Sequence, residues 1–171
     1  MPKALVCYYS RSGHTGKMAE TIAEALNRNG LPADLRKAET VGPDDLLAYD
    51  CLIFGSPTYY GTMAWPVKKL LDESVKHHGK LKGKVGGAFT SSGNLAGGNE
   101  TTVLDILNGL LIHGMIVQGD PQGDHYGPVS VGKPDSRSLK SCEKYARKLA
   151  VLTLKLFPPE EDETSKDGKH S

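Results

Sequence analysis

A short segment rich in hydroxyl groups and glycine follows the first apolar run of the chain and precedes a stretch with helical spacing. Free backbone N–H groups at a helix N-terminus and the helix dipole both attract an anion. Capping of that helix by Ser12 or Thr15 alone would explain one hydroxyl but not the cluster. The segment therefore predicts a phosphate-binding loop, which consists of Ser10, Arg11, Ser12, Gly13, His14, Thr15 and Gly16.

Spacing excludes three other phosphate-binding motifs. A Walker A motif needs Ser or Thr after its lysine, whereas Lys17 is followed by Met18, and the dinucleotide fingerprint GxGxxG is incomplete. A phosphatase loop with Cys7 as nucleophile would need an arginine where the chain has Gly13. The three cysteines are widely spaced and form no CxxC pair, so neither a disulfide framework nor a zinc site is indicated. Cys7 and Cys51 are expected to be buried.

Two later loops also combine glycine with hydroxyl or aromatic residues, and each follows an apolar run. The first loop contains Pro57, Thr58, Tyr59, Tyr60 and Gly61. The second contains Ser91, Ser92, Gly93, Asn94, Gly97 and Gly98. Ligands of parallel sheets bind beyond the carboxyl ends of the strands, near a switch in strand order. All three loops are therefore candidate parts of one binding site.

The elements that must position these loops alternate between strand-like and helix-like patterns. Strands are predicted over 4–9, 33–38, 51–55, 85–90 and 115–119, and helices over 17–29, 43–48, 63–76, 101–113 and 135–157. Parallel strands joined by crossover helices need cover on both faces. This alternation predicts a doubly wound three-layer α/β sandwich.

Length and composition fit one soluble domain. The 171 residues carry a net charge of +1, which argues against nucleic-acid binding. There is neither a long apolar run nor a secretory signal, so a cytoplasmic protein without membrane insertion is expected. A single domain is predicted over residues 1–157. The acidic tail 158–171 lacks apolar residues and is predicted to be disordered.

The motifs together resemble a known family. Residues 10–15 are similar to the flavodoxin phosphate loop, [ST]-x-[ST]-G-x-T. The ordered set YYS-x-x-G-H, SPT-x-x-G-x-M, FTS…GG-x-ETT, L-x-HGM and a later YG resembles the WrbA-type NAD(P)H:quinone oxidoreductases over nearly the whole chain before the tail. The resemblance implies a five-stranded parallel sheet of order 2-1-3-4-5. It also implies bound FMN, NAD(P)H as electron donor, a quinone-like acceptor, and a homodimer or homotetramer.

Each loop has an expected role toward FMN. The first would hold the phosphate, the two tyrosines would wall the ring, and the later glycines would bring amide donors to the flavin carbonyls and N5. Only one of Tyr59 and Tyr60 is expected to touch the ring. By resemblance His113 lies at the flavin edge, although a structural role at a helix C-terminus is the alternative.

Other side chains are assigned no chemistry. No metal-ligand spacing is present, and electron transfer through a flavin needs no protein base, so no catalytic side chain is expected. Trp65 is expected to pack, and His77 and His78 to form a solvated helix end.

The loop 90–100 contains no aromatic residue, and the chain before the tail is basic on balance. One flavin face would then be open for alternating donor and acceptor, which favours a two-electron enzyme with ping-pong kinetics. Two alternatives remain: a flavodoxin-type electron carrier without NAD(P)H oxidation, and a phosphate-sensing or partner-binding module without flavin.

Overall fold

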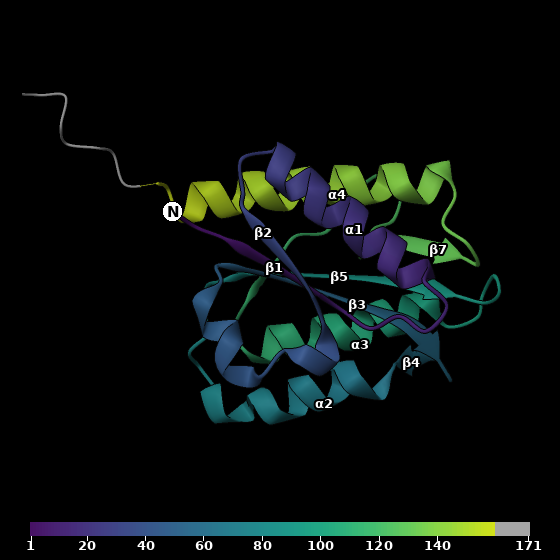
Figure 1. Ribbon diagram of the computed structural model, residues 1–171, viewed down its shortest axis with the longest axis horizontal. Coiled ribbons are helices and arrows are strands. Elements are labelled where there is room, and N and C mark those ends of the chain that lie inside the picture. The colour runs from purple at the N-terminus through teal and green to yellow at the C-terminus, as the bar shows by residue number, and fades with distance from the viewer. Residues whose placement is uncertain (160–171) are drawn as a thin grey trace, which may run out of the picture.

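A parallel sheet runs through the middle of the computed structural model, which describes residues 1–159 (Figure 1). Its main path has the order β2-β1-β3-β5-β6. Because β5 and β6 are the predicted fourth and fifth strands, the expected order is confirmed. The strands are β1 (Ala4–Tyr8), β2 (Ala33–Lys37), β3 (Cys51–Tyr59), β4 (Thr62–Met63), β5 (Val85–Ser92), β6 (Ile116–Val117) and β7 (Val129–Val131).

Helices cover both faces of the sheet, as the three-layer prediction requires. Figure 1 shows α1 and α4 on one face and α2 and α3 on the other. The α-helices are α1 (His14–Arg28), α2 (Trp65–Glu73), α3 (Asn99–Ile112) and α4 (Ser136–Leu156). Between β2 and β3 lie two short 3-10 helices of the described range 1–159, η1 (Ala38–Thr40) and η2 (Pro43–Ala48), and η3 (Ser74–His77) follows α2. The strand order reverses at β1, which lies between β2 and β3, and this places a crevice at the carboxyl edge.

Strand and helix ends differ from the prediction where the binding loops begin. β3 continues to Tyr59 because β4 folds back on it as an antiparallel hairpin, and β5 continues to Ser92 because β7 pairs with its end. Helix α1 begins at His14, earlier than expected. The predicted loops are therefore shorter and more firmly held than the sequence pattern indicated.

The fifth strand is interrupted. β6 pairs with the start of β5 and β7 with its end, and residues 118–128 leave the sheet between them. The N–H of Ala88 lies in this gap and donates to the hydroxyl of Tyr145 at 3.1 Å. A Cβ at Gly87 would lie 2.8 Å from that hydroxyl oxygen. Glycine at position 87 thus admits the Tyr145 ring, and Tyr145 replaces the missing strand partner.

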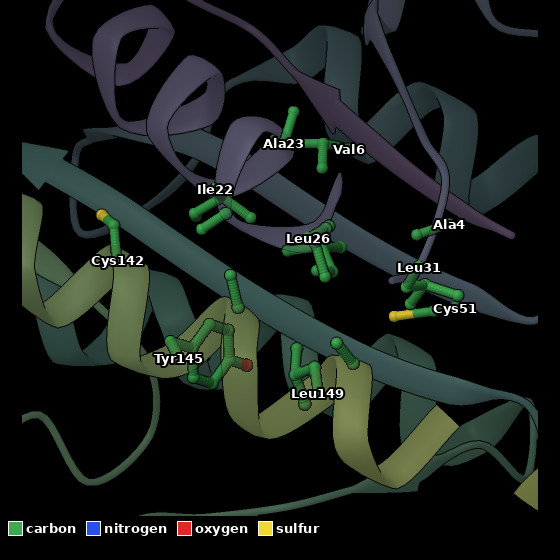
Figure 2. Close-up of a cluster of buried hydrophobic side chains, with 14 of the residues drawn as sticks. Ala4, Val6, Ile22, Ala23, Leu26, Leu31, Cys51, Cys142, Tyr145 and Leu149 are labelled. Atoms are coloured by element: carbon green, nitrogen blue, oxygen red, sulfur yellow. The ribbon is translucent and has the colours of Figure 1, made fainter. Parts of the chain in front are cut away.

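The core between the sheet and the α1–α4 layer is apolar and includes two of the cysteines. Figure 2 shows Cys51 and Cys142 among the labelled side chains of this cluster, together with Tyr145. All three cysteines are free and buried, and burial raises the pKa of each thiol to about 12. The packing role expected for Cys7 and Cys51 is confirmed.

The division of the chain into a domain and a tail stays a prediction. Pro158 and Pro159 are exposed and without regular structure, and the rest of the predicted tail lies outside the described residues.

His113 lies at the amino edge of the sheet. It follows the last residue of α3, and its Nε2 is 2.7 Å from Oγ of Ser74. Because the Ser74 hydroxyl donates to the carbonyl of Leu71, Nε2 must carry the proton of His113. The Nδ1 atom is buried, with no partner among the described residues. Burial, followed by the nearby His78 and His77, lowers the pKa of His113.

His77 is also buried, contrary to the expectation of a solvated helix end. Its Nε2 lies 2.6 Å from Oδ1 of Asp44, which precedes it by 33 positions. Lys76 bonds to the same carboxylate, and these hydrogen bonds lower the pKa of Asp44. The contact ties η3 to η2, whereas His78 is exposed, as expected.

We predict that Tyr145→Phe lowers the free energy of unfolding by about 1–3 kcal/mol, because the buried N–H of Ala88 loses its acceptor. Urea denaturation measures this value. Tyr126→Phe, at an exposed ring, is the control and should change stability by less than about 0.5 kcal/mol. Equal stability of Tyr145→Phe and the parent protein would contradict the assigned hydrogen bond.

We predict that stability falls as pH decreases below about 7, through the ordinary histidine pKa near 6.5. In this pH range His113 binds a proton in the unfolded chain more readily than in the folded chain, where its pKa is lowered. Acid therefore favours unfolding. His113→Gln keeps a donor for Ser74 and should reduce the slope of unfolding free energy against pH between about 5 and 7. His125→Gln, at an exposed histidine of the 118–128 segment, is the control. Identical slopes for the two variants would be the contrary result.

Candidate functional site

The loop between β1 and α1 is folded around the side chain of Ser10. Its Oγ accepts hydrogen bonds from the backbone N–H of Gly13 and of Gly16, both at 3.1 Å. Gly13 has φ +90°, in the left-handed region that favours glycine. Ser10 is therefore an internal brace of the loop, and the braced turn leads directly into α1.

The same loop leaves several backbone donors available. Among the described residues, the N–H groups of Ser12, His14 and Thr15 have no protein acceptor. Helix α1, which is described in full, has no acidic residue in its first turn that would neutralise its dipole. Ser12 and Arg11 are exposed beside these amides. This donor set fits an anion such as a phosphate group.

Hydroxyl groups connect the three loops beneath the crevice. Oγ1 of Thr15 lies 2.8 Å from Oγ of Ser91 at the end of β5. Oγ1 of Thr58 lies 3.1 Å from Oγ1 of Thr90, which donates to the Ser56 carbonyl at 2.6 Å. Strands β3 and β5 and the start of α1 are thus joined at the carboxyl edge of the sheet.

The β3–β4 hairpin separates the two candidate tyrosines. Tyr60 and Gly61 form its tip, both with positive φ, and the Tyr60 side chain is fully exposed. Tyr59 is 37 % exposed, and its ring packs edge-on against Tyr9 with a centroid distance of 6.3 Å. Since Tyr9 directly precedes the Ser10 loop, Tyr59 is the tyrosine held beside the anion site.

The loop after β5 approaches the hairpin closely. Thr101 donates its hydroxyl to the carbonyl of Gly61. Gly98 has φ +96°, and a Cβ there would lie 2.7 Å from the Cα of Gly61. Within the described residues, the N–H groups of Gly93 and Asn94 have no acceptor. The loop therefore presents free amides next to a hairpin that it also anchors.

A pocket of about 680 Å³ adjoins this loop, between it, β7 and the N-terminus of α4. Its lining includes Leu95 and Val131, and also Asp124 and Arg137, which bond to each other at 3.1 Å. Sequence reasoning missed this pocket, because β7 and the 118–128 segment carried no periodic signal.

The loop residues predicted for the site lie at one edge of the sheet, but His113 does not. Helix α3 follows β5 and runs back along the sheet, so its C-terminus lies at the amino edge, opposite the Ser10 loop. Within this chain His113 therefore lies apart from the other predicted site residues, and its side-chain contact is with Ser74. Its expected place at the flavin edge stays a prediction. Trp65 is 70 % exposed with Lys69 above its ring, so the expected packing role is wrong.

Tyr9 and Thr101 were not predicted as site residues. Tyr9 belongs to a predicted strand, and its position directly before Ser10 is the only sequence signal that could have identified it as a site residue. Thr101 belonged to the ETT part of the later motif, but no pattern showed that its hydroxyl would reach Gly61.

Residues 1–159 offer neither a metal-binding cluster nor a membrane-spanning helix. In this range no group of three or more His, Cys, Asp or Glu side chains is arranged to hold a metal ion. The helices in the same range are all too short or too polar to cross a membrane.

Known proteins share both the sequence pattern and the fold. The family described as "Flavodoxin domain" matches residues 5–108. The chain is 38 % identical over 159 residues to a protein named "Flavodoxin" from Aquifex aeolicus, covering 88 % of this chain and 86 % of that protein. It is 31 % identical over 190 residues to "NAD(P)H dehydrogenase (quinone)" from Archaeoglobus fulgidus, covering 91 % and 100 %.

A solved structure is similar over the same length. The flavodoxin, WrbA-like protein from Agrobacterium tumefaciens has a TM-score of 0.78 and 29 % identity, covering 91 % of this chain and 99 % of that chain. The strand order, the braced anion loop and these relatives agree with the resemblance stated from the motifs. The chain belongs to the flavodoxin family.

Proposed function

We propose that this protein is an FMN-dependent oxidoreductase that transfers two electrons from NAD(P)H to a quinone-like acceptor. The observation that carries the proposal is the set of free amides at the start of α1, which lies at the same sheet edge as the Tyr59 hairpin and the loop 93–98. A phosphate donor set beside an aromatic wall and a glycine-rich loop matches the three parts of FMN.

The phosphate end would be held by the loop 11–15. The amides of Ser12, His14 and Thr15 are free to donate, and the hydroxyls of Ser12 and Thr15 stand with them. Arg11 adds a positive charge at the exposed side. No carboxylate lies between residues 10 and 16, so a dianionic phosphate meets only donors from this loop.

The ring end would lie between the hairpin and the loop 93–98. Tyr59, fixed against Tyr9, offers an aromatic face, while the amides of Gly93 and Asn94 are donors for the polar edge of the ring. When bound, FMN supplies reversible two-electron redox chemistry. Pro57, Thr58 and the contact from Thr101 to Gly61 fix the spacing of the two walls.

Enzyme activity is favoured over simple electron carriage by the asymmetry of the two walls. The loop 93–98 has no aromatic side chain to cover the second face of the ring, and the 680 Å³ pocket beside it has the size of a small-molecule site. Donor and acceptor would use the open face in turn, which is a ping-pong scheme. Several relatives named "NAD(P)H dehydrogenase (quinone)" support the same reaction.

Carriage of electrons without NAD(P)H oxidation is the second candidate function, and the similarity to the Aquifex aeolicus protein named "Flavodoxin" supports it.

The main proposal includes the assembly of this chain into a homodimer or homotetramer. Large apolar side chains of Tyr60, Trp65 and Leu95 are exposed on elements that form or adjoin the site, as in surfaces that pair with another chain.

We predict that the purified protein binds FMN and then catalyses NADH- or NADPH-dependent reduction of benzoquinone, with parallel double-reciprocal lines. Absorbance at the nicotinamide and flavin bands measures both steps. FMN binding with negligible nicotinamide oxidation would instead support the carrier. Protein that takes up no FMN would contradict both candidates.

Ser12→Asp is expected to raise the Kd for FMN roughly 100-fold or more, because a carboxylate about 4 Å from the phosphate repels it by several kcal/mol at an effective dielectric of 20. Ser12→Ala is the matched control and should weaken binding by about tenfold at most. Fluorescence titration with FMN measures the Kd of both variants. Equal affinities of the two variants would place the phosphate elsewhere.

We predict that Tyr59→Ala raises the Kd for FMN about fivefold, since it loses roughly 1 kcal/mol of aromatic contact. Tyr60→Ala, from the exposed tip of the same hairpin, should change this Kd by less than twofold. The same fluorescence titration compares the pair. A larger loss of FMN affinity in Tyr60→Ala than in Tyr59→Ala would show that Tyr60, and not Tyr59, contacts the ring.

A further inference from the structure

One buried hydrogen bond links the phosphate end of the site to the strand that carries the ring loop. Oγ1 of Thr15 and Oγ of Ser91 are 2.8 Å apart, although the residues are 76 positions apart in the chain. Thr15 is 1 % exposed and Ser91 6 % exposed. Among the described residues, Ser91 Oγ has no other polar partner.

The position of Ser91 on β5 separates it from the ring loop. Ser92 faces the other side of the strand, and its hydroxyl donates to the carbonyl of Asn94 within the loop. Ser91 instead faces α1 and meets Thr15. Its register partner on β7 is Ser130, a buried serine whose hydroxyl donates to the carbonyl of Gly132 and, among the described residues, makes no hydrogen bond to the phosphate loop.

The direction of the hydrogen bond follows once an anion occupies the loop. Either hydroxyl can be the donor in the bond between Thr15 and Ser91. A phosphate dianion only accepts hydrogen bonds, so a Thr15 hydroxyl that binds it must donate its single proton there. The oxygen of Thr15 is then left to accept, and the Ser91 hydroxyl is the donor that reaches it.

We propose that Ser91 is a positioning residue for phosphate recognition: it holds the Thr15 hydroxyl in the orientation that donates to the phosphate of FMN. This inference rests on the proposed function. It reassigns Ser91 from the ring, where the motif placed it, to the phosphate end. Because Ser91 lies on β5 two residues before Gly93, it also links phosphate binding to the strand that supports the ring loop.

The test compares Ser91→Ala, Thr15→Val and the double variant with the parent protein and with the control Ser130→Ala. Each is titrated with FMN and with riboflavin, which lacks the phosphate, and the 31P NMR shift of bound FMN is recorded. We expect Ser91→Ala to raise the Kd for FMN about fivefold and to leave the Kd for riboflavin within twofold. The bound 31P signal should move in Ser91→Ala and not in Ser130→Ala.

The double variant distinguishes action through Thr15 from an independent effect. If Ser91 acts through Thr15, adding Ser91→Ala to Thr15→Val causes no further loss of FMN affinity. Additive losses, equal weakening of FMN and riboflavin, or an unmoved 31P signal would each overturn the inference while FMN binding by the parent protein stands. Failure of the parent protein to bind FMN would instead overturn the proposed function, and this inference with it.

Discussion

The two hydrogen bonds that Ser10 accepts from Gly13 and Gly16 determine the course of the chain where the site begins. They close the turn after β1 within a few residues, so α1 starts at His14 and its first amides point out of the turn. The early start also places Thr15 inside the first helical turn, where its hydroxyl is buried against Ser91. One serine side chain thus fixes both the exposed donors and the buried contact beneath them.

Contacts between the remaining loops set the width of the crevice. Glycine at position 98 permits the chain to pass the tip of the hairpin, where a Cβ would collide with Gly61. The hydroxyl of Thr101 then secures that approach with a hydrogen bond to the Gly61 carbonyl. The aromatic wall and the glycine-rich wall are consequently held to each other before any ligand arrives, which lowers the entropy lost on binding.

Much of this arrangement was predictable from sequence, for identifiable reasons. Apolar runs separated by helical spacing indicated the strands and helices, and the glycine and hydroxyl loops after the strands indicated the edge used for binding. The pairing of Thr15 with Ser91 and of Tyr9 with Tyr59 was not predictable, because both contacts join residues far apart in the chain. Strands as short as β4 and β7 also lack a periodic signal.

His113 differs from the other predicted site residues in its place within this chain, at the amino edge of the sheet. The order of the predicted elements already implied that place, because the helix after the fourth predicted strand runs back along the sheet and ends at the amino edge.

The gap in the fifth strand has a consequence for how this chain tolerates change in length. β6 and β7 are each hydrogen-bonded to β5 independently, and Tyr145 satisfies the backbone between them. The 118–128 excursion therefore leaves and re-enters the sheet at two fixed points, so its length is not coupled to the register of either half. Residues can therefore be inserted into the 118–128 segment, next to the carboxyl edge of the sheet, while the strands keep their register.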